Sequence, residues 1–422
     1  MIDPVPTILK IETGQNHEGV SMQNLGSHAN RLMPGALAIV LVLAIALSPV
    51  SARAQTFTVL YSFTGGFDGA NPYAPPILDS AGNLYGTTSA GGSSLWCAIG
   101  CGTVFTINPA GNESVLYSFA GDQDGESPLY GPMLRDGAGN LYGNTSSGGR
   151  NGGGTVFRLN PANKEIIVSL SGVTGPEGPT GGLAADASGN GYGTTIDGGT
   201  GCAPYGCGTV FEINRAGKVT VLHSFQGGAS DGLTPFSGVI RDSAGNLYGT
   251  TFNGGPNNAG TVFKVDSTGK ETILHAFDSV DGDNPFGGLV RDNAGNLYGT
   301  TDGGGPTFAG EVFKLDPAGN LTVLYGFCSQ SGCADGYAPF GTLIRDSAGN
   351  LYGTTVAGGD TFNGTVYKLD TSGKLTVLHS FNGTTDGAQI LTGLTFDKAG
   401  NLYGTASYGG AYGYGTVYKI TP

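Results

Sequence analysis

The sequence has few charged residues and no run of basic ones. Asp, Glu, Lys and Arg make up only 12% of the 422 residues, and the formal net charge is −13. A protein that binds nucleic acid or an anionic membrane surface needs Lys and Arg to neutralise phosphates. We therefore exclude nucleic acid as a partner.

The sequence also has only one long apolar run, from Ala36 to Leu47. As a helix, twelve residues span about 18 Å, which is short of the ~30 Å core of a bilayer and argues against a membrane anchor. Arg31 precedes the run, and Ala52-Arg53-Ala54 after it is an A-x-A cleavage pattern. We predict that residues 1–54 are a signal peptide cleaved after Ala54, with translation starting at Met1 or Met22. Residues 55–422 are then one exported domain with no membrane attachment.

Cysteine is scarce, and no C-x-x-C spacing occurs. The six cysteines form three local pairs: Cys97 with Cys101, Cys202 with Cys207, and Cys328 with Cys333. Metal ligation is the alternative, but the three His of residues 55–422 (His223, His275 and His379) lie far from the pairs in sequence. We predict three disulfides, as expected of an exported protein, and assign no metal ligand and no cofactor.

Glycine is abundant, 78 residues, and it belongs to a repeat. The segment NLYGTT and its near copies begin every 50 to 57 residues, at Asn83, Asn140, Asn190, Asn246, Asn296, Asn350 and Asn401. Each copy contains four short candidate strands separated by turns such as D-S-A-G-N, in which Gly supplies a positive φ and Asp caps the turn. This period predicts an all-β fold, a seven-bladed β-propeller with four antiparallel strands per blade.

The phase of the repeat predicts how the ring closes. The mature chain opens with an outermost strand, Thr58 to Phe63, and ends with a third strand, Gly415 to Ile420. We expect the N-terminal strand to complete the last blade, which removes both free sheet edges. The likeness of the copies also makes their seven Tyr, from Tyr85 to Tyr403, candidate core residues.

The repeat resembles a known family. The succession D-x-A-G-N-L-Y-G-T-T, G-G, G-T-V-F-K-L, T-V-L-x-S-F and D-G-x-x-P is similar to the Gloeo/Verruco (GloVer) tandem repeat of exported bacterial proteins, over residues 57–422. The resemblance implies the repeat architecture and export, and it implies no defined chemistry. The third copy departs from the pattern, with Gly191 in place of Leu and Glu177 in place of Asp.

The loops of variable sequence are expected on one face of the ring, because the loop between strands two and three and the loop that joins two blades leave a blade on the same side. Recognition residues tend to lie on such loops. Aromatic side chains there are candidate ligand-binding residues: Trp96, Tyr205, Phe252, Phe308, Phe362, Tyr408 and Tyr412. Their rings either stack on a sugar or protein partner or pack onto the adjacent blade.

Acidic and basic residues also recur. An acidic residue followed by Gly recurs in the blade-joining loops, at Asp68, Asp124, Glu177, Asp231, Asp281, Asp335 and Asp386. We interpret it as a turn residue; a cation ring is the alternative, and the oxygen-rich stretch from Asp278 to Asn284 is its best candidate for calcium. Arg135, Arg241, Arg291 and Arg345 are expected to form local ion pairs.

Two functions follow from the sequence. The first is a secreted non-catalytic module, a monomer, that binds a polysaccharide or surface protein through the variable-loop face. The second is a secreted glycoside hydrolase or lyase that uses acids departing from the repeat: Glu126, Asp197, Asp302 and Asp360. We favour the first, because no catalytic residue set can be assembled from the sequence and propellers serve many functions.

Overall fold

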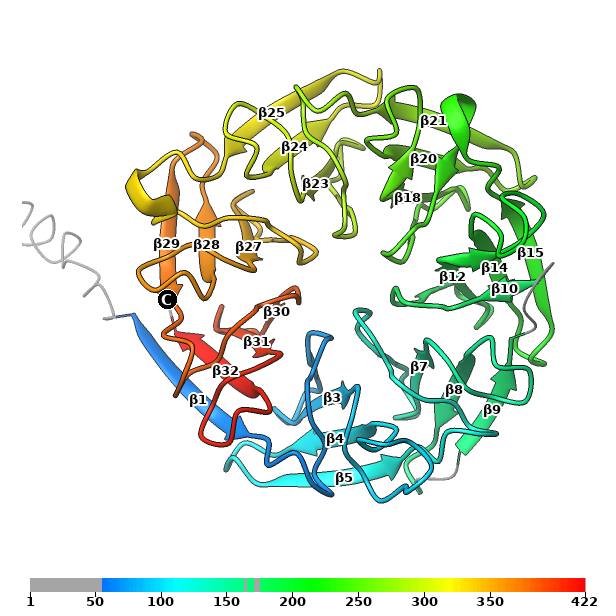
Figure 1. Ribbon diagram of the computed structural model, residues 1–422, viewed down its shortest axis with the longest axis vertical. Coiled ribbons are helices and arrows are strands. Elements are labelled where there is room, and N and C mark those ends of the chain that lie inside the picture. Colours follow the sequence, from blue (N-terminus) through cyan, green and yellow to red (C-terminus); the bar gives the residue numbers. More distant parts are fainter. Residues whose placement is uncertain (1–54, 163–164, 171–174, 422) are drawn as a thin grey trace, which may run out of the picture. The chain divides into compact units, whose positions relative to one another are not determined.

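The computed structural model describes residues 55–162, 165–170 and 175–421. Seven four-stranded antiparallel sheets stand around a central axis as the blades of a β-propeller (Figure 1). The predicted fold is confirmed. The predicted signal peptide lies outside the described residues and stays a prediction.

Each blade runs from a two-residue inner strand to a longer outer strand. Blade 1 comprises β2 (Ile77–Leu78), β3 (Leu84–Thr88), β4 (Thr103–Ile107) and β5 (Glu113–Ser118). Blade 2 comprises β6 (Leu134–Arg135), β7 (Leu141–Thr145), β8 (Thr155–Leu159) and β9 (Glu165–Ser169). Blade 3 comprises β11 (Ala184–Ala185), β12 (Gly191–Thr195), β14 (Thr209–Ile213) and β15 (Val219–Ser224). Blade 4 comprises β17 (Ile240–Arg241), β18 (Leu247–Thr251), β20 (Thr261–Val265) and β21 (Glu271–Ala276).

The other three blades repeat this order. Blade 5 comprises β22 (Val290–Arg291), β23 (Leu297–Thr301), β24 (Glu311–Leu315) and β25 (Leu321–Gly326). Blade 6 comprises β26 (Ile344–Arg345), β27 (Leu351–Thr355), β28 (Thr365–Leu369) and β29 (Leu375–Ser380). Blade 7 comprises β30 (Thr395–Phe396), β31 (Leu402–Ala406), β32 (Thr416–Thr421) and β1 (Thr56–Ser62).

Blade 7 closes the ring as predicted. The outer strand β1 pairs antiparallel with the C-terminal strand β32, from Thr56 opposite Thr421 to Ser62 opposite Thr416. Figure 1 shows the blue N-terminal strand beside the red C-terminal one. Phe57 on β1 stacks on His379 of blade 6, with ring centroids 3.6 Å apart. The first and last segments of the described chain therefore hold each other in place.

The hairpin turn after each inner strand is fixed by its aspartate. In blade 1, Asp79 Oδ1 accepts hydrogen bonds from the backbone N–H groups of Ala81 and Asn83, and Oδ2 accepts from the Asn83 amide and the Tyr85 hydroxyl. The same Tyr-to-Asp bond recurs in the other six blades. The repeated Tyr thus fastens the turn; six of the seven are half-buried and only Tyr352 is buried.

The glycine of the NLYGTT segment is required by the core. A Cβ atom on Gly86 would lie 2.4 Å from Cζ of Phe105, whose ring covers this glycine from the neighbouring strand β4. Between blades, a fully buried Phe after the outer strand meets the ring of the next blade edge-on, for example Phe63 on Phe105 and Phe327 on Tyr367. At the junction of blades 2 and 3, Leu170 takes the place of this Phe and packs with Phe211, so a buried apolar cluster joins these blades as well.

Candidate functional site

The variable loops gather on one face of the ring, as predicted. In every blade, the loop that leads into the blade pairs through its backbone with the loop between the second and third strands. The pairs are Ala70 with Ala90, Glu126 with Ser147, β10 (Pro176–Glu177) with β13 (Asp197–Gly198), β16 (Gly232–Leu233) with β19 (Asn253–Gly254), Asp283 with Gly303, Tyr337 with Ala357, and Ala388 with Tyr408. We call this side the variable-loop face.

Most of the candidate aromatic side chains project from this face into solvent. Trp96, Tyr205 and Phe308 are more than 70% exposed, and Tyr412, Phe362 and Tyr408 are exposed to a lesser degree. Phe252 is half-buried and packs edge-on against Phe236 and Phe286. Packing onto neighbouring residues therefore describes Phe252 and, through its contact with Tyr73, also Tyr408, whereas the more exposed rings remain open to a partner.

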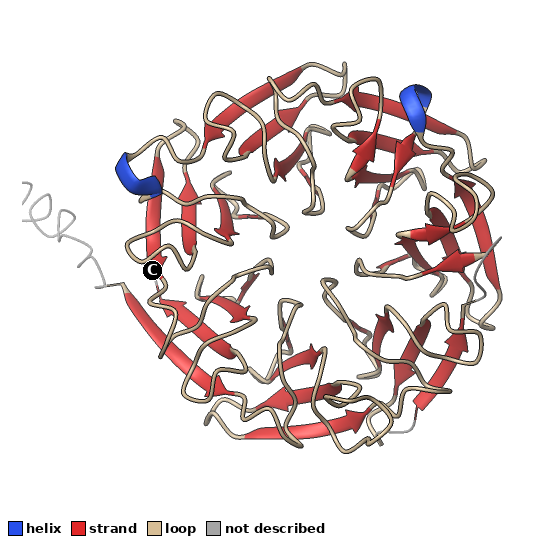
Figure 2. Cartoon of the chain, in the orientation of Figure 1, coloured by secondary structure: helices blue, strands red, loops and turns tan. Residues whose placement is uncertain are grey.

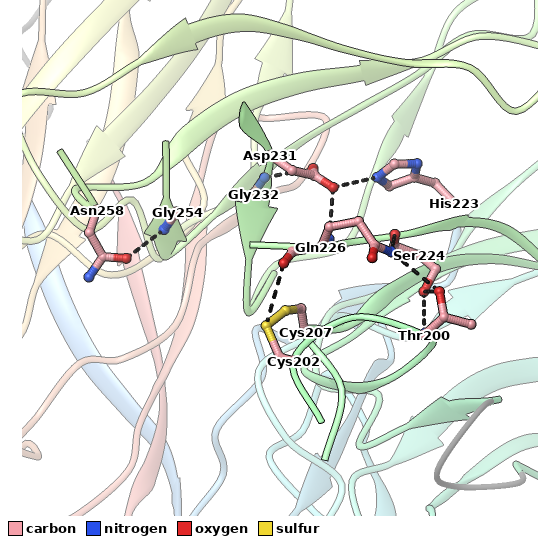
Figure 3. The surroundings of a disulfide bond; sticks show 10 residues. All are labelled: Thr200, Cys202, Cys207, His223, Ser224, Gln226, Asp231, Gly232, Gly254 and Asn258. Carbon is pink, nitrogen blue, oxygen red and sulfur yellow. Dashed lines mark hydrogen bonds and ion pairs between the residues drawn. A yellow bond between two sulfur atoms is a disulfide. The ribbon is translucent and has the colours of Figure 1, made fainter. Parts of the chain in front are cut away.

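All three predicted disulfides are present: Cys97–Cys101, Cys202–Cys207 and Cys328–Cys333. The first two close loops between second and third strands, and the third lies in a blade-joining loop. Figure 3 shows the Cys202–Cys207 bridge beside Gln226, whose backbone carbonyl faces Cys202. Two disulfides hold the loops that carry Trp96 and Tyr205, so these exposed rings are attached to constrained backbone.

A second aromatic group lies at the centre of this face, and only two of its members, Phe252 and Tyr408, were among the candidates from the sequence. We call it the central aromatic cluster: Tyr73, Tyr130, Phe236, Phe286, Phe340, Phe252 and Tyr408. Tyr130 of blade 2 meets Phe286 of blade 5 at 5.1 Å between centroids, and Phe286 contacts Phe236 at 4.7 Å and Phe340 at 4.3 Å. Contacts between blades so distant in the ring show that the rings meet across the axis.

Two tyrosines extend the central aromatic cluster toward blade 7. Tyr73 contacts Tyr130, and its hydroxyl lies 2.6 Å from that of Tyr408. Burial raises the pKa of Tyr73, and the hydrogen bond with Tyr408 raises it further. Burial likewise raises the pKa of Tyr130. The phenols are therefore neutral at physiological pH and act as uncharged donors and acceptors at the rim of the cluster.

A short sequence pattern marks part of the central aromatic cluster. Four of its rings follow a proline that precedes the inner strand, as in Pro72-Tyr73 and Pro285-Phe286. The loops that carry these residues reach toward the centre of the ring (Figure 2). Behind the rings lies a cavity of about 440 Å³, lined by Phe236, Phe286 and Phe340, by the glycines of the inner segments and by Arg241. A single sequence does not reveal that these loops converge.

Two pairs of carboxylates stand on the same face. Glu177 and Asp197 are cross-strand neighbours in the two-stranded β10–β13 sheet, and Asp302 lies near Asp283. Burial, together with the charge of Asp283, raises the pKa of Asp302 to about 6. Asp302 occupies the repeat position of Phe252, so it belongs to the rim of the central aromatic cluster. Glu126 and Asp360, the other acids that depart from the repeat, are not brought together with either pair.

The six repeated Asp of the blade-joining loops are turn residues that accept hydrogen bonds from backbone N–H groups of their own loops, whereas Glu177 lies in β10. Asp124 accepts hydrogen bonds from the backbone N–H groups of Ala120 and Gly121 and from the Tyr117 hydroxyl, the last at 2.6 Å. In blades 4 and 6 a His takes the place of the Tyr, as in His275 with Asp281. Within the described residues, no group of three close metal ligands includes a residue of the stretch from Asp278 to Asn284.

The predicted arginine ion pairs are wrong. The guanidinium carbons of Arg135, Arg241, Arg291 and Arg345 lie 5.4–5.9 Å from the centroid of a Tyr ring in the preceding blade. Throughout the described part of the chain, ion pairs join only His and Asp. A cation over an aromatic face is attracted by the ring quadrupole, so these arginines link neighbouring blades without an acidic partner.

Solved structures share this fold. Two extracellular domains assigned to hybrid two-component systems of B. thetaiotaomicron align with TM-scores of 0.57 and 0.52, at 14% and 17% identity, over 86% and 87% of this chain. The chain spans only 39% and 41% of those two structures. A puromycin hydrolase aligns with a TM-score of 0.53 at 13% identity, over 81% of this chain and 51% of its own. At such identities the likeness concerns the fold alone.

No curated protein sequence matches the chain. No helix among the described residues is long and apolar enough to cross a membrane. The model of the Gloeobacter/Verrucomicrobia repeat matches residues 47–249, 97–306 and 237–422, which together cover most of the sequence. The chain belongs to the Gloeobacter/Verrucomicrobia repeat family.

Proposed function

We propose that the protein is an exported, non-catalytic binding module whose variable-loop face binds a polysaccharide. The observation that carries this proposal is the arrangement of aromatic rings, with a packed central aromatic cluster and separate exposed rings around it. Flat rings with a polar rim bury much surface at a small cost in conformational entropy, and they accept uncharged partners. The three disulfides fit an oxidising compartment.

The rigidity of the cluster supports binding over a merely structural role. Tyr130 has a φ of 44°, a left-handed conformation that is strained for a residue with a side chain. The stretch from the repeated Asp to the inner strand, here Asp124 to Leu134, is one residue longer than in blades 1, 4, 5, 6 and 7, and within it Tyr130 meets Phe286. A strained residue that places a ring at the centre of an exposed face is typical of a preorganised binding surface.

The test is a binding screen of the protein against cell-envelope and plant polysaccharides, with product formation followed by mass spectrometry. We expect binding without products, and at least about tenfold weaker binding in Trp96→Ala or Tyr205→Ala. Val323→Ala, which truncates a partly exposed apolar residue on the outer strand β25, is the matched control. Absence of polysaccharide binding, or equal loss in the Val323 variant, would refute the proposal.

The second candidate function is a glycoside hydrolase or lyase, and the Asp283–Asp302 pair favours it. A carboxyl group with a pKa of about 6 beside a second carboxyl group is suited to general-acid catalysis. In the same screen, saccharide products that disappear in Asp302→Asn, but not in the exposed loop variant Asp360→Asn, would establish this function in place of the first.

A further inference from the structure

One histidine–aspartate pair differs from the other two. The blade-joining Asp meets a His of the preceding outer strand at three places: His223 with Asp231, His275 with Asp281, and His379 with Asp386. In the latter two, His Nε2 lies 2.7 and 2.9 Å from Asp Oδ2 and the two atoms share a hydrogen bond. Between His223 and Asp231 the distance is 3.4 Å, and His223 Nε2 has no hydrogen-bond partner although it is inaccessible to solvent.

A third donor completes this group. Glu271, the first residue of β21, places a carboxylate oxygen within 4.8 Å of both a ring nitrogen of His223 and an Asp231 oxygen. Its Oε1 is also buried and lacks a hydrogen-bond partner. Three ligand atoms of metal-binding types thus converge, and two of them have unsatisfied bonding capacity that a buried polar atom rarely leaves unused.

A comparison of the blades shows that this combination of one His and two carboxylates is specific to one blade junction. The residue equivalent to Glu271 is Leu321 in blade 5 and Phe57 in blade 7, the blades that follow His275 and His379, so these two His–Asp pairs lack a third donor there. Glu113 is equivalent to Glu271 in blade 1, but the residue beside it is Tyr61 rather than a His. Among the described blade junctions, only that between blades 3 and 4 combines a His with two carboxylates.

We propose that His223, Asp231 and Glu271 bind a divalent transition-metal ion, with zinc the preferred ion. Zinc in proteins is bound by His nitrogen at about 2.0–2.1 Å and by carboxylate oxygen at about 2.0–2.2 Å. Two ligands at about 2.1 Å that subtend a tetrahedral angle lie about 3.4 Å apart. This is the separation of His223 Nε2 and Asp231 Oδ2, which is too long for a good hydrogen bond between them.

The surroundings orient the ligands. Asp231 Oδ2 accepts a hydrogen bond from the backbone N–H of Gln226 at 2.8 Å, and Oδ1 accepts from that of Gly232 at 2.7 Å (Figure 3). These bonds fix the carboxylate while leaving a lone pair on each oxygen for an ion, as outer-shell partners of metal ligands commonly do. The side chains of His223 and Asp231 are 17% and 9% exposed, so the group lies just beneath the surface of the outer rim.

A bound ion would join the outer strands of two blades. His223 lies on β15 of blade 3, and Glu271 lies on β21 of blade 4. The ion would therefore act as a cross-link at the outer rim, next to the loop closed by Cys202 and Cys207 (Figure 3). All six cysteines are in disulfides, so they offer no competing thiolate ligands.

The experiment is a titration of the chelator-treated, dialysed protein with Zn²⁺ by calorimetry, and with Co²⁺ by visible absorption. We expect one ion per chain, and tetrahedral Co²⁺ bands that added Zn²⁺ removes. Loss of a residue that only orients a ligand typically weakens metal binding by ~10–100-fold. Glu271→Leu and His223→Tyr each remove a ligand itself, so we expect them to weaken binding by about 100-fold or more. Both substitutions introduce residues that other blades carry at these positions, which protects the fold.

His275→Tyr is the matched control, because His275 has the same partner type without a third donor. It should leave the stoichiometry and affinity unchanged. Zn²⁺ should also raise the melting temperature of the wild type and of His275→Tyr, and should leave that of Glu271→Leu unaffected, because an ion that binds only the folded state stabilises it. Failure of the wild type to bind either ion, or equal weakening in all three variants, would overturn the proposal.

Discussion

Glu311 gives the sharpest test of how the repeat builds its core. It occupies the first position of β24, where the other six blades carry a buried Thr, and it is completely buried. In five blades that Thr shares a hydrogen bond of 2.8–2.9 Å with a Thr of the adjacent strand. Both carboxyl oxygens of Glu311 instead lack hydrogen-bond partners. We therefore expect Glu311→Thr to stabilise the protein at alkaline pH.

The size of the gain follows from the pKa. Burial, and secondarily the charge of Asp281, raises the pKa of Glu311 from 4.5 to about 7. This difference corresponds to about 3 kcal/mol at 1.36 kcal/mol per pKa unit, and screening by nearby solvent lowers it to about 2 kcal/mol. Because the folded protein holds the proton more tightly, the wild type has this stability in full below pH 4.5 and loses it as the pH rises through 7.

The assay is urea unfolding followed by far-UV circular dichroism at pH 5 and pH 8. The advantage of Glu311→Thr over the wild type should grow by about 2 kcal/mol between the two pH values. Asp360→Asn, which removes one negative charge from an exposed loop, should show no such growth. A difference between Glu311→Thr and the wild type that is the same at both pH values would refute the inference that a buried, unpaired carboxylate forms at this position.

Three further predictions concern the ring itself. Deleting residues 55–64 removes β1 and should prevent stable folding; a soluble mutant with a cooperative melting transition would contradict this closure. Gly86→Ala should lower the unfolding free energy by about 1–3 kcal/mol, since the new Cβ would overlap the Phe105 ring, whereas Gly137→Ala, with open space around it, should have little effect in the same denaturation assay. Although burial alone would raise the pKa of Asp79, hydrogen bonds from Asn83 and Tyr85 outweigh it and lower the pKa below 3.8. This stabilisation is present above pH 3.8 and lost as the pH falls through the folded-state pKa, so the destabilisation by Asp79→Asn should shrink in acid titrations followed by circular dichroism; a constant difference would count against the role of the ionised carboxylate.

The sequence predicted what depends on contacts within one copy of the repeat. The turn at Asp79, the strand pairing, the closure by β1 and the local disulfides all involve residues that are close in sequence or equivalent between copies. The central aromatic cluster could not be predicted in the same way. Tyr130 and Phe286 are far apart in sequence and meet only because the inner ends of blades 2 and 5 face each other across the axis.

The arginine prediction failed for a related physical reason. Arg135 is the last residue of the inner strand β6 and precedes Asp136, which suggested an ion pair within one copy. The carboxylate of Asp136, however, already accepts hydrogen bonds from Asn140, from Tyr142 and from the backbone of its own turn. The guanidinium therefore lies over Tyr85 of the preceding blade. The partner of a side chain at a blade edge is set by the neighbouring copy, which a pattern within one copy does not display.

Comparing the copies with one another nevertheless recovers contacts that no single copy reveals. In five blades the hydroxyl of a Ser at the end of the outer strand accepts a hydrogen bond from a backbone N–H in the loop before the third strand. In blade 1, for example, Ser118 accepts from the N–H of Ser93. Blades 4 and 5 carry Pro256 and Pro306 at the donor position, and Ala276 and Gly326 at the acceptor position.

This paired change has a simple cause. Proline has no N–H to donate, so a buried Ser hydroxyl opposite it would lose its partner, and Ala or Gly avoids that cost. In blade 5, Gly326 lies opposite Glu311 in the strand register, and a Cβ atom there would have no neighbour within 4 Å. Glycine loses more conformational freedom on folding than alanine does, so the double variant Glu311→Thr with Gly326→Ala should be more stable than Glu311→Thr by about 0.4–1 kcal/mol at pH 5 and at pH 8 alike. A double variant less stable than Glu311→Thr in the same urea assay would show that the backbone at this position requires Gly326.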